Sequence, residues 1–145
     1  MGYTRGLLHG LAQLLAADGV GVYRDSGVYT EAETGIIIGT VPQSPPAIVA
    51  LIPYALFDDP TLSDSVLGLQ LRFRSGTYDP RDVLDLADAA FDSLQGHPGV
   101  DLSATARLLI AERTSSIPLG ENASGFPESA DSYQLMLHRP SAHRT

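Results

Sequence analysis

The sequence predicts a fold of the α/β (α+β) class, in which a mostly antiparallel sheet carries two amphipathic helices on one face. In the predicted strand 66–75, positions 67–74 alternate between larger apolar residues and Gly, Gln or Arg, which indicates one buried and one open face. Two other stretches, 3–17 and 80–94, repeat apolar residues at helical spacing. The expected order of elements is α-β-β-β-β-α-β-β.

The first predicted helix runs from about Tyr3 to Ala17. Its apolar face comprises Leu7, Leu8, Leu11, Ala12, Leu14 and Leu15. Arg5 and His9 lie on the opposite face, and Gly19 follows the helix, where a left-handed residue is favoured. A short strand is expected over residues 20–24.

The next two apolar runs, 35–41 and 47–57, are predicted to be strands, because β-branched residues are frequent in them. The link between them, Pro42–Pro46, cannot be helical, since proline lacks an amide hydrogen and restricts the residue before it. Pro53 cannot donate to a sheet ladder, so we expect it at a bulge or an edge.

The second predicted helix begins after Asp79, a favourable N-cap, with Pro80 at its first position. Its outer face is charged and comprises Arg81, Asp82, Asp85, Asp88 and Asp92. Arg81 and Asp85 are spaced for an ion pair across one turn.

Two further strands are expected near 105–114 and 132–139. Residues 115–131 between them are rich in Ser, Gly, Pro and Asn, which predicts an extended loop. Residues 140–145 are predicted to be a flexible C-terminal tail. The whole chain, 1–145, is predicted to be a single domain.

Composition excludes several classes of protein. The chain has no cysteine, so a disulfide scaffold and a Cys-ligated metal site are impossible. Its formal net charge of −8 argues against a general nucleic-acid binder, whose affinity comes mainly from Lys and Arg. The apolar run 47–57 is too short to span a bilayer, and we expect a soluble cytoplasmic product.

No strong catalytic or cofactor motif is present: the sequence lacks G-x-S-x-G, a P-loop and H-E-x-x-H. One acidic cluster, Asp58, Asp59 and Asp64, could supply oxygen ligands to Mg²⁺ or Ca²⁺, or could simply be an acidic turn. The four histidines fall in four different environments, so we expect neither a catalytic residue nor a metal ligand among them.

Arginines mark the open face of the predicted strand 66–75. Arg72 and Arg74 project from that face, and Arg107 and Arg113 alternate in the same way on another strand. If the two strands are neighbours, these side chains form a row. The row is either solvated and paired with acidic residues or part of a contact between subunits, where the arginine fork makes charge-assisted hydrogen bonds.

Short matches to one group of proteins are spread over most of the chain. They are Gly2-Tyr3-Thr4-Arg5-Gly6-Leu7-Leu8, Glu33-Thr34-Gly35-Ile36, the segment from Asp58 to Arg72, Asp79-Pro80-Arg81-Asp82-Val83 and Leu137-His138-Arg139-Pro140-Ser141. Together they resemble the siphophage tail terminator (tail completion) family, whose members are also labelled minor capsid proteins. The match is weakest over 115–131.

The resemblance implies a structural virion protein without catalytic residues, cofactor or membrane contact. Members of that family form a ring, typically a hexamer, at the head-proximal end of the tail tube. The ring stops tube polymerisation and docks the head-tail connector protein. The implied partners are therefore the chain itself, the tail tube protein and the connector. The implied location is the tail or neck of the virion, assembled in the host cytoplasm, with DNA passing through the lumen without specific binding.

A ring needs two different sticky surfaces on each subunit, because its contacts are heterologous. The sequence offers Arg72 and Arg74 on the open sheet face and the acidic face of the second helix. Within the predicted loop, Ile117, Leu119 and Phe126 suit an arm that orders on a partner. An acidic channel would also keep DNA from sticking.

Two alternatives remain open at this level. One is another neck component, such as a head-completion or connector adaptor protein. The other is a small metal-dependent hydrolase that uses Asp58, Asp59 and Asp64.

Overall fold

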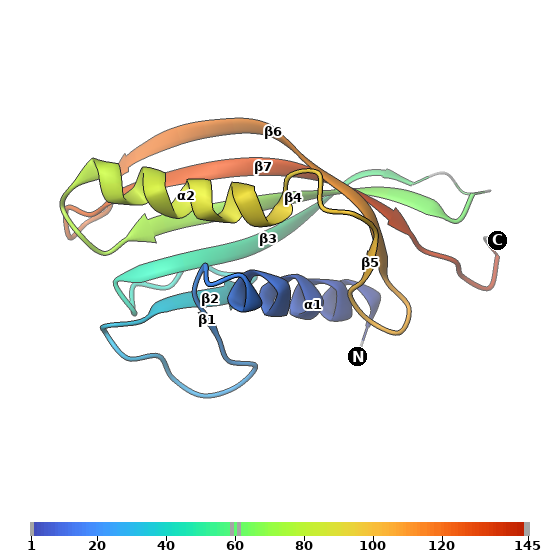
Figure 1. Cartoon of the computed structure of the whole chain (residues 1–145), viewed down its shortest axis with the longest axis horizontal. Coiled ribbons are helices and arrows are strands. Elements are labelled where there is room, and N and C mark those ends of the chain that lie inside the picture. Colours follow the sequence, from blue (N-terminus) through green and yellow to red (C-terminus); the bar gives the residue numbers. More distant parts are fainter. Residues whose placement is uncertain (1, 59, 61, 144–145) are drawn as a thin grey trace.

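The computed structural model describes residues 2–58, 60 and 62–143. In this part of the chain, seven strands form one sheet, and two helices form a single layer on one of its faces (Figure 1). The elements are α1 (Tyr3–Ala17), β1 (Val22–Tyr23), β2 (Thr34–Ile38), β3 (Ala47–Asp58), β4 (Asp64–Ser75), α2 (Pro80–Leu94), β5 (Val100–Asp101), β6 (Arg107–Glu121) and β7 (Pro127–His138). The predicted order is confirmed, with β5 as an additional short strand.

The sheet has the strand order β1-β2-β3-β4-β7-β6-β5. The pairs β1–β2 and β2–β3 are parallel, whereas the other four pairs are antiparallel. The sheet is therefore mixed, and the expectation of a mostly antiparallel sheet is corrected at this edge. The reason is the proline-containing link: it carries the chain back from Ile38 so that Ala47 pairs with Thr34. Alternation within a strand predicts its faces but not its direction.

Both helices pack on the same face of the sheet, as predicted. Leu7 and Leu11 of α1 and Ala90 and Leu94 of α2 share one buried cluster with strand residues such as Leu71. The helix ends are also joined, because the Ser93 hydroxyl donates to the Asp18 carboxylate at 2.5 Å. No helix in the described residues is long and apolar enough to cross a membrane.

Local sequence signals correctly predicted where α2 begins and that Pro53 lies at a sheet edge. The Asp79 carboxylate accepts the Arg81 amide hydrogen at 2.9 Å, which confirms the predicted N-cap of α2. Pro53 lies just beyond Leu51, the last β3 residue that pairs with β2. One side of β3 is therefore a sheet edge at Pro53, where a missing amide hydrogen costs no ladder bond.

The segment 115–131 is not an extended loop. β6 continues to Glu121 and β7 begins at Pro127, so the connecting turn comprises only residues 122–126. The Asn122 side chain accepts from the amides of Ser124 and Phe126 and shapes this turn. Sequence patterning missed the strand because 114–121 is exposed on both faces and β6 carries three register shifts, which erase the alternation.

Candidate assembly interface

Arg74 is buried rather than presented to a partner. Its side chain is only 3% exposed, and its guanidinium donates to the carbonyls of Pro42, Gln43, Pro45 and Pro46 at 2.7–3.2 Å. It also donates to the Glu128 carboxylate at 3.1 Å. The predicted interface role of Arg74 is therefore wrong: the proline-containing link folds over the sheet face and covers the side chain.

The predicted arginine row does not form. β7 separates β4 from β6, so the two arginine-bearing strands are not neighbours. Arg72 lies half-buried, with its guanidinium 3.8 Å from Glu128. Arg113 pairs with Tyr133 on the helix side of the sheet. There its guanidinium lies 4.3 Å from the centre of the Phe91 ring and 3.5 Å from the buried Asp131 carboxylate.

Most arginines are engaged within the chain. Ion pairs join Arg24 to Glu33, Arg72 and Arg74 to Glu128, Arg81 to Asp79, Arg107 to Asp101 and Arg113 to Asp131. Arg139 lies over the Tyr3 ring at 4.1 Å. Among the described residues, Arg5 is the arginine that neither forms an ion pair nor lies over an aromatic ring. The cationic surface available to a partner is therefore small.

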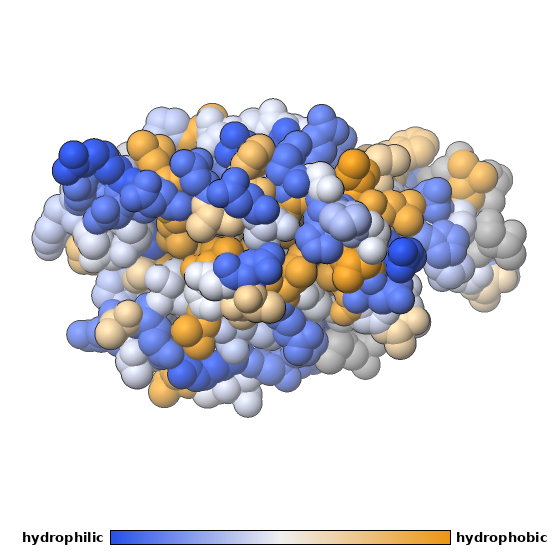
Figure 2. Space-filling model, in the orientation of Figure 1, coloured by the Kyte–Doolittle hydropathy of each residue, from blue (hydrophilic) through white to orange (hydrophobic). Residues whose placement is uncertain are grey.

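The outer face of α2 is acidic and exposed. Asp85, Asp88 and Asp92 are all exposed, and Figure 2 shows hydrophilic side chains along this helix. Arg81 does not pair with Asp85 as its spacing predicted; it reaches back to the Asp79 carboxylate at 2.8 Å. Asp82 accepts a hydrogen bond from the Thr77 hydroxyl at 2.6 Å. This face thus carries uncompensated negative charge.

In the β6–β7 hairpin, only two of the three predicted contact residues are exposed to a partner. Ile117 is 52% exposed and Leu119 is also exposed. Phe126, in contrast, packs on Tyr78, with ring centres 5.0 Å apart, and so anchors the turn to the segment before α2. The hairpin is a folded arm rather than a segment awaiting a partner.

The acidic cluster does not assemble a metal site in the part of the chain that the structure describes. No group of three or more potential ligands is close enough to hold an ion there, and Asp59 lies outside the described residues. Asp58 pairs with Ser65 across β3 and β4, while the Asp64 carboxylate lies 3.0 Å from His138 Nδ1.

Sequence reasoning missed an apolar row on the sheet face opposite the helices. Phe57, Val66, Met136 and Ile110 are cross-strand partners on β3, β4, β7 and β6. Phe57, Met136 and Ile110 are exposed. Each residue is part of an apolar run in its own strand, and only the strand register brings the four into a row.

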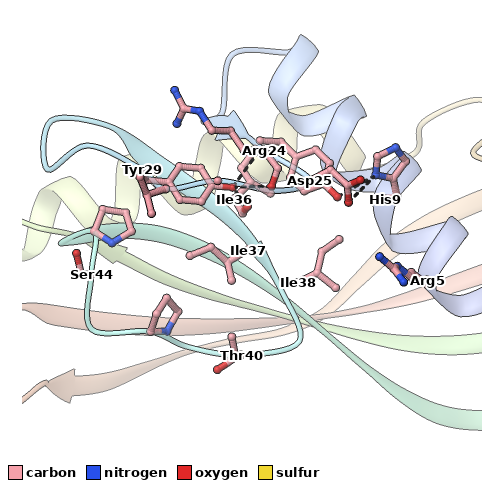
Figure 3. Close-up of a pocket in the computed structure, with 15 residues that line it drawn as sticks. Arg5, His9, Arg24, Asp25, Tyr29, Ile36, Ile37, Ile38, Thr40 and Ser44 are labelled. Atoms are coloured by element: carbon pink, nitrogen blue, oxygen red, sulfur yellow. Dashed lines mark hydrogen bonds and ion pairs between the residues drawn. The ribbon is translucent and has the colours of Figure 1, made fainter.

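A cleft of about 630 Å³ beside β2 was also missed. Its apolar wall comes from Ile36, Ile37 and Ile38, and α1 places Arg5 and His9 together at one end (Figure 3). His9 Nδ1 lies 2.9 Å from the Tyr23 hydroxyl.

Two tyrosines shape this cleft. Burial, together with the nearby Asp25 carboxylate, raises the pKa of Tyr23. The Tyr29 hydroxyl donates to the Ile36 carbonyl at 2.8 Å and fixes the loop beside β2. The cleft walls come from three segments that are separate in the sequence, so a local sequence pattern cannot predict the cleft.

Comparison with known proteins identifies the family. A family model described as "Bacteriophage tail terminator protein" matches residues 14–139. The chain belongs to this tail terminator family. The predicted resemblance is thereby confirmed, and the chain is a structural protein of the phage tail and virion.

The tail terminator fold is also present in a solved virion. A chain in the structure titled "Virion of native gene transfer agent (GTA) particle" is similar to this tail terminator, with a TM-score of 0.66 and 18% identity. The similarity covers 94% of this chain and 98% of that chain, and it shows a shared fold. No curated protein sequence matches.

Proposed function

We propose that this tail terminator forms a hexameric ring on the head-proximal end of the tail tube. The ring stops tube polymerisation and presents a docking surface to the head-tail connector protein. The match of the family model over residues 14–139 carries this proposal. The shape of the subunit supports it, because the two opposite edges of its sheet are different surfaces, as a closed head-to-tail ring requires.

The role proposed here is structural rather than catalytic, and DNA passes the ring without specific binding. The charge distribution supports the second point. Nearly all described arginines are engaged by the chain itself, while Asp85, Asp88 and Asp92 remain exposed. A surface of this kind repels phosphate and gives it no cluster of cations to bind.

The test uses purified full-length protein with assembled tail tubes. Mass photometry should show a hexamer, and negative-stain images should show one ring at one end of each tube. Tubes capped in this way should stop lengthening when tube protein is added, whereas uncapped tubes should continue to grow. A protein that stays monomeric with and without tubes, and leaves tube growth unchanged, would refute the proposal.

The same preparation separates the terminator from another neck component. A terminator should bind tail tubes and leave isolated portal complexes unbound in co-sedimentation. Binding to portal complexes without binding to tubes would assign the protein to the head side of the neck and contradict the capping role.

A further inference from the structure

The sheet ends in two open edges that lie on opposite sides of the molecule (Figure 1). On one side, β5 pairs with β6 only at Arg107 and Leu108, so residues 114–121 pair with no outer strand in the described chain. On the other side, β1 pairs with β2 only at Gly35 and Ile36. Ile37 and Ile38 of β2 therefore have a neighbouring strand only on the β3 side.

The first surface, which we call the β6 edge (residues 114–121), is apolar and acidic. Ile117 and Leu119 are exposed, and Glu121 is exposed without an ion pair in the described residues. Glu112, just before the edge, is exposed in the same way. Pro118 lacks an amide hydrogen and a register shift follows it, so this edge is poorly suited to strand addition and presents side chains for contact instead.

The second surface is the cleft beside β2. Ile37, Ile38 and Pro42 line it, and Val28, which is 87% exposed, stands at its wall. Arg5 and His9 lie together at one end, as Figure 3 shows. Arg5 is the arginine for which the described chain supplies no acidic partner. The cleft is thus an apolar trough with Arg5 at one end, where the Asp25 carboxylate also lies, 4.0 Å from His9 Nδ1 (Figure 3).

We propose that the β6 edge of one copy docks into the cleft beside β2 of the next copy, and that repetition of this contact closes the ring. The two surfaces are complementary: exposed Ile117 and Leu119 meet an apolar trough, and the unpaired glutamates meet Arg5. Because the β6 edge and the cleft lie on opposite sides of the sheet, the contact is heterologous. Each copy presents its β6 edge to one neighbour and its cleft to the other. This inference rests on the proposed ring and specifies its subunit contact.

Two sets of substitutions at exposed positions test the contact. Ile117→Asp places a charge on the β6 edge, and Val28→Asp combined with Arg5→Glu reverses the character of the cleft. Each variant alone should be monomeric in sedimentation velocity while its thermal unfolding remains cooperative. An equimolar mixture should form a dimer and nothing larger, because only one intact edge and one intact cleft can meet.

The matched control is Leu84→Asp on the acidic face of α2, where Leu84 is 60% exposed. This variant carries the same kind of change outside both surfaces and should assemble as the wild type does. All measurements are repeated in the presence of tail tubes, where rings are counted on tube ends.

The outcomes separate the two proposals. If the wild type forms rings and both variants also do, or if the mixed variants form no dimer, the edge-to-cleft contact is refuted while the ring stands. Variants that form free rings but fail to bind tubes would assign these surfaces to the tube and refute the contact as well. If the wild type forms no ring alone or on tubes, the proposed function itself fails.

Discussion

At the scale of single residues, burial decides what a charged side chain does. Arg72 and Arg74 have the same position in the alternation of β4, yet only Arg74 is enclosed by the link at Pro42–Pro46. Arg74, on β4, holds the link and β7 together through its contacts with the link carbonyls and Glu128. The alternation of apolar and polar residues correctly identifies the two faces of a strand. A loop distant in the chain determines whether a given face is exposed to solvent.

Replacing Arg74 should therefore destabilise the fold. We expect Arg74→Ala to lower the free energy of unfolding by about 3–5 kcal/mol, because it leaves Glu128 and several carbonyls without their donor. Arg81→Ala, at an exposed ion pair, should cost much less. Urea denaturation of both variants provides the measurement. Equal losses would show that the buried network contributes little.

A second residue-scale prediction concerns acid stability. Two hydrogen bonds from Arg24, each 2.8 Å, and one from the Thr30 amide lower the pKa of Glu33 to about 2. Because the folded-state pKa is depressed, this stabilisation is present above the unfolded-state value of about 4.5 and is lost as the pH falls toward 2.

The thermal midpoint should therefore fall between about pH 4.5 and pH 2, and Glu33→Gln should reduce that fall. Arg24→Gln should have the same effect because it removes the main donor, and the two substitutions together should add nothing further. Differential scanning calorimetry across this pH range gives the comparison. An unchanged profile in both variants would rule out this pair as the cause.

At the scale of elements, α2 separates its two tasks by face. Val83, Ala87 and Ala90 are buried against the sheet, while Asp85, Asp88 and Asp92 remain in solvent. Periodicity predicted this division correctly, because a helix that covers a sheet must bury one stripe. The outer half of β6 was not predictable in this way, since residues 114–121 bury neither face.

The acidic face of α2 should control contact with DNA. We expect the wild type to leave duplex DNA unbound at low salt. The triple variant Asp85→Arg, Asp88→Arg, Asp92→Arg should bind it. A plot of log K against the logarithm of the salt concentration should have a slope of about −3, because each of three phosphate contacts contributes about −0.9. A triple Asp→Asn variant is the control and should remain unbound, because it adds no cation. DNA binding by the wild type in a mobility-shift assay would contradict the prediction.

At the scale of the whole molecule, the sheet is open at both edges, and assembly should stabilise it. If rings form from these subunits, the thermal midpoint of the wild type should rise with protein concentration, since binding between copies favours the folded state. The midpoint of Ile117→Asp should be independent of concentration over the same range. Calorimetry over a hundredfold concentration range makes the comparison, and a concentration-independent wild type would argue against self-assembly.

The sequence by itself determined the helices, most strands, the shared helical face and the family, because these depend on local periodicity, capping and short segments of similarity. Only the tertiary structure decided the parallel edge of the sheet, the burial of Arg74, and the cleft between Arg5 and the loop at Val28. Each of these depends on segments distant in the chain. Their contacts are set by topology and register, which a pattern read along one strand or helix does not contain.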